Sequence, residues 1–155
     1  MTRILFLHGA ADRIQAAAQW LQRAWQERAK ASAQGPSVLV YAPAPEAAER
    51  LDRLLWTQPA LSFVPHCHAD APLALDTPIL IAARLDDPPV DTCLLNLSNE
   101  LPAGFSRFEV LVEVVSTDDA DRLPARERFK FYRDRGYAIE NHDISGGMQC
   151  APMMI

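Results

Sequence analysis

Basic residues are concentrated in one short stretch of this 155-residue chain, between positions 122 and 135. Six of the fifteen arginine and lysine residues lie there: Arg122, Arg126, Arg128, Lys130, Arg133 and Arg135. The acids of the same stretch are Glu127 and Asp134, so it carries a formal charge of +4. Three aromatic residues lie among the cations: Phe129, Phe131 and Tyr132. Arginine binds carboxylates through paired N–H donors. The stretch therefore predicts a binding site for a ligand that is both acidic and hydrophobic.

A helix over this stretch places Arg122, Arg126, Phe129 and Arg133 on one face, since their spacings are four, three and four. Lys130 borders that face. Three interpretations remain open: a solvated surface helix, a peptide-binding surface, and direct binding of single-stranded DNA. The net charge of −5 includes this +4, so the rest of the chain carries −9 and opposes phosphate groups. Contact with DNA is therefore expected to be local, or indirect through a partner.

Other residues could do chemistry. His66-Cys67-His68 offers soft metal ligands, but a structural zinc site needs a second Cys/His cluster, which the sequence lacks. His8 follows the first buried run, where an acid–base group could act. The turn after it has one glycine, so neither a dinucleotide fingerprint nor a P-loop is present. A Gly-x-Ser-x-Gly motif is also missing. We expect no metal and no cofactor, and a small α/β enzyme using the crevice near His8 remains an alternative.

The elements that position these residues follow from apolar patterning. The buried runs typical of strands are Ile4–Leu7, Val38–Tyr41, Ile79–Ala82, Cys93–Leu97 and Val110–Val115, with an edge strand expected over Tyr137–Ile144. Helices are expected after Asp12, from Pro45, and over the basic stretch, with Pro124 in its first turn. The segment from Trp56 to His68 is expected to be a loop. This alternation predicts the α/β class with a largely parallel sheet.

Bulk properties predict one cytoplasmic domain. Residues 1–144 are expected to form it, and 145–155 a C-terminal tail that is mobile at its start. The N-terminal apolar run is too short for a membrane span or a signal peptide, so no membrane partner is expected. The cysteines Cys67, Cys93 and Cys150 are too few and too scattered for a disulfide framework.

Two motifs resemble those of the bacterial DNA polymerase III chi subunit family. The stretch from Ala125 to Arg133, continuing to Gly136-Tyr137, is similar to that family's C-terminal helix. The residues that resemble its central motif are Arg50-Leu51-Asp52, Leu55-Trp56, Pro59 and Ser62-Phe63-Val64-Pro65-His66. The order and separation of the motifs also match, and the similarity is weakest over 67–89 and in the tail. The resemblance implies a Rossmann-like three-layer sandwich with helices on both faces, no nucleotide site and no catalysis.

The resemblance also implies a function. Chi is a non-catalytic accessory subunit of the clamp-loader assembly, and it binds the acidic, Phe-terminated C-terminal tail of single-stranded DNA-binding protein. By motif, Arg126, Phe129 and Lys130 fall on tail-binding positions. Arg122 stands where the family usually has lysine, and Phe129 replaces a tyrosine, so a hydroxyl contact is lost. Arg133, on the same face, completes the expected site.

A second surface is implied by the same resemblance. In the family it binds the clamp-loader psi subunit, in hosts that have one. Trp56 and Phe63 resemble residues of that surface. The alternative is that both rings belong to the core, where large aromatic side chains are usually buried.

Overall fold

The computed structural model describes residues 2–30, 38–57, 65–69, 77–86, 88 and 91–147. Phe63 and the tail from residue 148 lie outside the described residues, so the predicted division into a domain and a tail stays a prediction. The elements, in chain order, are β1 Arg3–Ala10, α1 Arg13–Lys30, β2 Val38–Tyr41, α2 Pro45–Thr57, β3 His66–His68, β4 Ile79–Ala82, β5 Cys93–Asn96, the 3-10 helix η2 Phe105–Arg107, β6 Val110–Ser116, α3 Asp119–Asp134 and β7 Ile139–Asp143.

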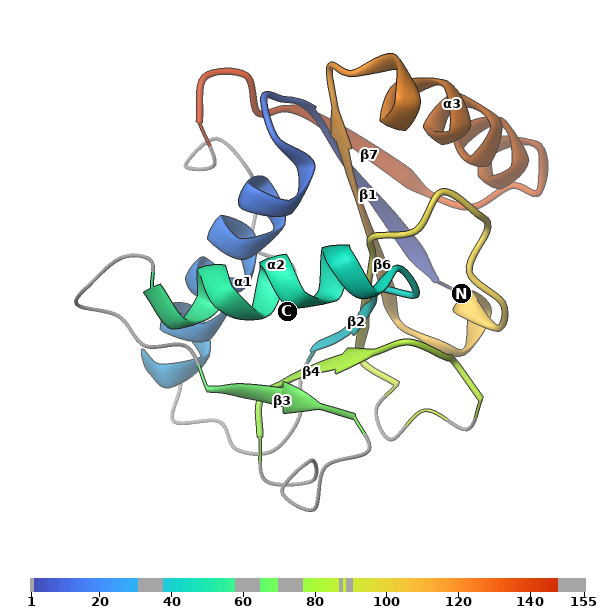
Figure 1. Ribbon diagram of the computed structural model, residues 1–155. Helices are drawn as coiled ribbons and strands as arrows, with labels where there is room; N and C mark the ends of the chain where they lie inside the picture. The colour runs from blue at the N-terminus through green and yellow to red at the C-terminus, as the bar shows by residue number, and fades with distance from the viewer. Residues whose placement is uncertain are drawn as a thin grey trace.

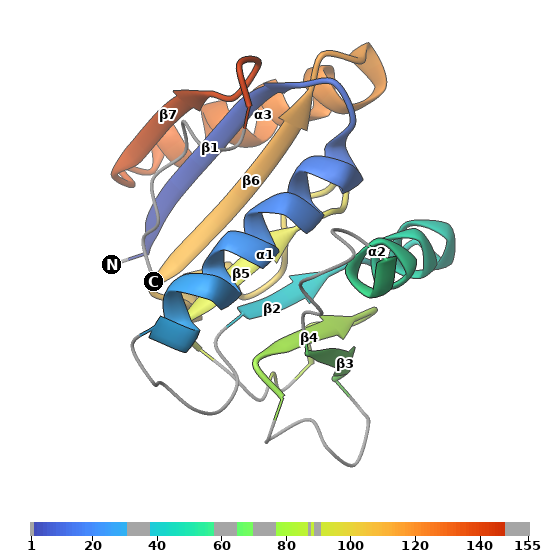
Figure 2. The ribbon, with the colours of Figure 1, turned by 90° about the vertical axis from the view of Figure 1, so that its left-hand side faces the viewer.

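The strands form one seven-stranded sheet in the order β3-β4-β2-β5-β6-β1-β7. Every described pairing is parallel, so the predicted parallel sheet is confirmed. Helices α1 and α2 cover one face and α3 the other (Figure 1), and the turned view in Figure 2 shows α1 in front of the sheet and α3 behind it. Parallel sheets need cover on both faces because their strands are apolar on both sides. The fold is the α/β three-layer sandwich predicted above.

Strand β1 shows how the two faces are filled. Leu5 and Leu7 belong to the apolar cluster under α1, whereas Ile4 and Phe6 belong to the cluster under α3. Side chains alternate along a strand, so each face of β1 contributes to one core layer. The same alternation directs the next residue on the α3 side, His8, toward the C-terminal end of that face.

Two local predictions were wrong. The segment Trp56–His68 was predicted as a loop, but α2 extends to Thr57, and His66–His68 forms strand β3 through parallel pairing with β4. Pro124 was predicted in the first turn of the basic helix. Because Asp118 caps that helix and α3 starts at Asp119, Pro124 lies in the second turn, where it removes one backbone hydrogen bond.

Candidate binding pocket beside helix α3

Both ends of α3 are fixed by local hydrogen bonds. At the start, the Asp118 side chain accepts from the backbone N–H of Ala120 at 3.1 Å, which is an N-cap. At the end, Gly136 has φ 81°, and the N–H of Tyr137 donates to the carbonyl of Tyr132 at 3.1 Å. This is a Schellman C-cap, which glycine permits because it has no Cβ. The caps fix the limits of the helix that carries the predicted site.

A buried polar network fixes the rotation of α3 on the sheet. Arg128 and Glu113 are buried and share two hydrogen bonds, Nε to Oε2 at 2.9 Å and Nη2 to Oε1 at 3.1 Å. The Tyr132 hydroxyl donates to Glu113 at 2.8 Å, and the Asn96 amide donates to the same carboxylate at 3.1 and 3.2 Å. Burial, together with the Glu113 charge, raises the pKa of the Tyr132 phenol, so this hydroxyl remains a donor. Arg128 and Tyr132 therefore face the sheet and cannot contact a ligand.

A pocket of about 300 Å³ lies between α3 and the C-terminal ends of the strands beneath it. Arg122, Arg126 and Phe129 line it from α3, as the sequence predicted for one helical face. The other lining residues are Phe6, His8, Gly9, Val115, Ser116, Thr117, Ala125 and Asn141. Phe129 packs edge-on against Phe6, with ring centroids 5.2 Å apart. The pocket thus has an aromatic floor and guanidinium groups at its wall.

Lys130 and Arg133 do not line this pocket. Both are exposed on α3, and the Arg133 guanidinium lies 3.4 Å from Asp134 of the same helix. The structure therefore brings three of the five predicted tail-binding residues to the pocket and leaves two on the outer surface of the helix.

The cations of the basic stretch are not equally available to a ligand. Arg128 is neutralised inside the protein, Arg122 pairs with Asp119, and the Arg135 guanidinium lies 4.7 Å from the Phe131 ring centre. Within the described parts of the chain, no acidic side chain pairs with Arg126 or Lys130. These two carry the charge that an anionic ligand can reach with least competition.

A larger hollow of about 810 Å³ lies at the carboxyl ends of the central strands. This is where open α/β sheets bind nucleotides. Arg13 fills its base, donating to the carbonyls of Val114 at 2.8 Å and Ser98 at 2.8 Å. Asp12 caps α1 by accepting from Ile14 and Gln15, both at 3.0 Å. The carboxylates of Asp12 and Asp118 thus occupy the N-termini of α1 and α3, where a phosphate would otherwise bind.

His8, the candidate acid–base residue, lines the smaller pocket instead of this hollow. Ser116 lies in the same pocket, but its hydroxyl donates its hydrogen bond to Asp121 at 2.6 Å and not to His8. This arrangement gives no support to a serine nucleophile activated by His8.

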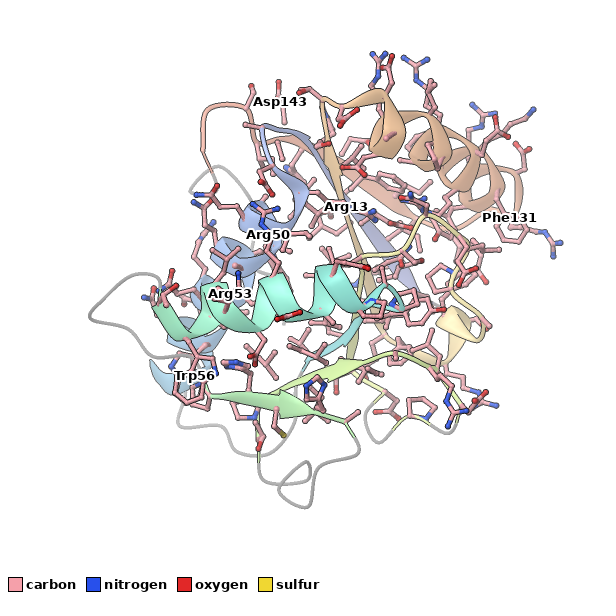
Figure 3. All side chains as sticks on the ribbon, viewed as in Figure 1. Arg13, Arg50, Arg53, Trp56, Phe131 and Asp143 are labelled. Carbon is pink, nitrogen blue, oxygen red and sulfur yellow. The ribbon has the colours of Figure 1, made fainter. Side chains whose placement is uncertain are left out.

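The predicted second surface is described only at Trp56. This side chain is 62% exposed at the C-terminal end of α2 (Figure 3), so it does not belong to the core. Its ring meets that of His66 edge-on at 5.7 Å between centroids. Phe63 lies outside the described residues.

The metal candidate His66-Cys67-His68 is spread over two faces of β3. His66 Nε2 lies 2.8 Å from Asp52 Oδ1 on α2, whereas Cys67 packs into the apolar cluster on the α3 side. Alternation along the strand accounts for this separation. Across the described ranges, no group of three or more metal-ligating side chains is placed to hold an ion.

Comparison with protein families matches residues 1–140 to the family described as DNA polymerase III chi subunit, HolC. The chain belongs to this family. The Pseudomonas aeruginosa DNA polymerase III subunit chi is 30% identical over 150 residues, which cover 93% of this chain and 98% of the relative. The Escherichia coli (strain K12) subunit chi is 32% identical over 111 residues, covering 68% and 72%. The Haemophilus influenzae subunit chi is 29% identical over 117 residues, covering 71% and 77%.

The family assignment confirms the resemblance inferred from the two motifs and places the chain among replication accessory subunits. Among the described residues, no helix is long and apolar enough to cross a membrane.

Sequence reasoning missed the Glu113 network of this chi-family chain. The signal was present, because Glu113 is the one charged residue within the apolar run Val110–Val115. A charge in a buried strand requires a partner inside the protein. Sequence reasoning also assigned His8 to a possible enzyme crevice, whereas the structure places it in the pocket beside α3.

Proposed function

We propose that this chain is a non-catalytic chi subunit that binds the acidic, Phe-terminated C-terminal tail of single-stranded DNA-binding protein in the pocket beside α3. Through this contact it would link the clamp-loader assembly of DNA polymerase III to protein-coated single-stranded DNA in the cytoplasm. The observation that carries the proposal is the pocket itself, which Phe129, Arg122 and Arg126 line together. A C-terminal phenylalanine fits such a pocket, because its ring can pack on Phe129 and its free carboxylate can pair with an arginine.

The size of the pocket supports a side chain as the ligand. About 300 Å³ is at the lower end of the range for small-molecule sites. The tail's terminal phenyl group would pack against Phe129, and its carboxylate would accept hydrogen bonds from Arg126. Charge-assisted bonds of this kind are about twice as strong as neutral ones.

The outer surface of α3 supports contacts to the acids that precede the terminal residue. Lys130 and Arg133 are exposed beyond the pocket, on the same helix as Arg126. A short tail held this way would bind with micromolar affinity, at roughly −8 kcal/mol, and the affinity would fall with salt. Several tails on one oligomer would raise the effective affinity.

Direct binding of single-stranded DNA is less well supported. Of the six cations in the basic stretch, Arg128 is buried and Arg122 and Arg135 have intramolecular contacts. A groove for single strands combines several free cations with aromatic rings on which bases stack. Here Phe129 is partly buried and packs on Phe6, so its ring lines a pocket and does not present an open face on which a base could stack.

For the second surface, we propose a protein partner equivalent to the clamp-loader psi subunit, with Trp56 and Phe63 in the contact. The support is the exposure of Trp56, since a large ring that is 62% exposed gains apolar burial when a partner covers it. This contact would connect the subunit to the rest of the assembly.

The decisive experiment is a fluorescence-anisotropy titration of the protein with a labelled acidic peptide ending in phenylalanine. Arg126→Ala should weaken binding about tenfold, because it removes a charge-assisted hydrogen bond. Arg135→Ala is the matched control: it removes the same charge at the C-cap of the same helix, from a residue that contacts the Phe131 ring. If wild type and Arg126→Ala bind the peptide equally, the assigned site is wrong. Tight binding of a bare oligonucleotide at physiological salt would instead favour the DNA alternative.

A further inference from the structure

The pocket beside α3 has a second wall, which the basic helix does not supply. It is formed by the ends of two parallel strands, with His8 and Gly9 from β1 and Asn141 from β7. His8 is exposed, so its ring is accessible to a ligand. A carboxylate placed between the walls would have Arg126 on one side and the imidazole on the other.

The strand geometry fixes His8 on this side of the sheet. Ile4 and Phe6, four and two residues earlier, belong to the core layer under α3. Side chains alternate along a strand, so His8 lies on the same face as these two residues. The carbonyl of His8 accepts from the N–H of Ile144 at 2.8 Å, so the backbone at this point is held. The imidazole is thus carried by a fixed strand end and not by a loop.

The charged groups around His8 come from two elements. On α3, Arg122 and Arg126 line the same pocket. On β7, Asp143 is the register partner of His8 and interacts with it electrostatically; Figure 3 labels Asp143 at the end of that strand. Hydrogen bonds from Ser145 hold the pKa of Asp143 below its usual value, so this carboxylate keeps its charge above about pH 5. The β6–α3 segment adds Val115, Ser116 and Thr117, which do not titrate.

We propose that His8 is a third carboxylate-binding group of this pocket, and that its protonation strengthens binding of a ligand's terminal carboxylate below neutral pH. The inference rests on the proposed function and deepens it. Histidine is the side-chain type that changes charge between about pH 5 and 8. Neutral His8 offers the carboxylate at most one N–H, whereas the imidazolium adds a positive charge to the pocket.

The direction of the pH effect follows from linkage. A ligand that binds the protonated form more tightly increases proton uptake when it binds. Affinity therefore rises as the pH falls. For an exposed ion pair we expect a gain of about two- to fivefold between about pH 8 and pH 6. The ligand's own carboxylates remain ionised over this range.

The test is isothermal titration of wild-type protein with the acidic Phe-terminated peptide at about pH 6, 7 and 8, at constant ionic strength. Each pH is run in two buffers of different ionisation enthalpy, which reports proton uptake directly. His8→Gln should bind no more tightly at about pH 6 than at about pH 8, because it lacks both the gain in affinity and the proton uptake that wild type shows. Circular dichroism and thermal unfolding show whether His8→Gln is folded.

His142→Gln is the matched control. His142 lies one residue from Asn141 on β7 but does not line the pocket, so its replacement should leave the pH dependence intact. A peptide with a C-terminal amide in place of the carboxylate should bind more weakly and without the pH-dependent gain. An unchanged pH profile in His8→Gln, or an equal gain with the amide peptide, would overturn the inference while leaving the site standing. If the wild-type protein does not bind the peptide, or if Arg126→Ala binds it as tightly as wild type does, both the proposed function and the inference are overturned.

Discussion

Arg128 of α3 and Glu113 of β6 form a doubly hydrogen-bonded ion pair inside the protein, with Nε–Oε2 and Nη2–Oε1 distances of 2.9 and 3.1 Å. Both side chains are buried, at 4% and 0% exposed. One cation of the basic stretch therefore anchors the helix while its neighbours face solvent. Because the pair sits between α3 and the sheet, it fixes which helical face turns toward the pocket.

Replacing Arg128 by alanine should destabilise the fold by about 3–5 kcal/mol, because it leaves the Glu113 carboxylate buried without its counter-ion. Urea unfolding followed by circular dichroism measures the change. Arg126→Ala, two residues away and exposed, should stay within about 0.5 kcal/mol of wild type. Adding Glu113→Gln to Arg128→Ala should recover part of the loss, since the uncompensated charge is removed. Equal stabilities of Arg128→Ala and Arg126→Ala would contradict this account.

Gly9→Ala should destabilise the protein by about 1 kcal/mol or more and disturb the pocket. Gly9 has φ 83°, and a Cβ there would lie 2.7 Å from Asp143 Oδ1. Backbone strain and displacement of Asp143 both lower the free energy of unfolding. Gly104→Ala provides the comparison, because its φ is 74° but nothing lies within 4 Å of the added Cβ. If thermal unfolding shows the same loss for both variants, the contact with Asp143 contributes nothing.

The sequence predicted the fold and one face of the site because both depend on local periodicity. Apolar runs located β2 and β4 at their observed bounds, Val38–Tyr41 and Ile79–Ala82. The 3.6-residue helical period placed Arg122, Arg126 and Phe129 together, and all three line the pocket. Helix and strand periods thus carry this information directly.

The remaining parts depend on contacts between distant segments. Strand β3 is only three residues long and is defined by pairing with β4, which no local pattern reveals. The pairing of Arg128 with Glu113 joins residues fifteen positions apart on different elements. The formal charge of the basic stretch includes Arg128 among its surface cations, whereas in the folded protein this side chain is buried and paired with Glu113. The second wall of the pocket, with His8, was hidden for the same reason.

Trp56→Ala should reduce partner binding at the second surface with little effect on stability. The ring is 62% exposed, so truncation should cost less than about 1 kcal/mol in urea unfolding. Pull-down with the psi subunit of a host that encodes one measures the interaction. Arg53→Ala is a suitable control, because Arg53 lies on the same helix and forms an exposed ion pair with Glu49. Undiminished psi recovery by folded Trp56→Ala would reject Trp56 as a contact.

Cys93 should make the stability of the protein fall at alkaline pH. Its thiol is fully buried in β5, and burial raises its pKa to about 12. In the unfolded chain a cysteine thiol ionises near pH 8.5. The folded state therefore binds a proton that the unfolded state loses between these values. Stability linked to Cys93 is complete below about pH 8.5 and declines as the pH rises toward 12, by about 1.4 kcal/mol per pH unit.

Urea unfolding of wild type and Cys93→Ala at about pH 7, 8.5 and 10 isolates this effect, because other alkaline titrations are common to both proteins. Cys93→Ala should start less stable at pH 7, since it leaves a small cavity. The difference should shrink by about 2 kcal/mol at pH 10, where the wild type has lost its thiol contribution. Cys67, which is only partly buried, supplies the contrast: Cys67→Ala should follow the wild-type pH profile more closely. A constant difference between wild type and Cys93→Ala at all three pH values would show that the buried thiol does not resist ionisation.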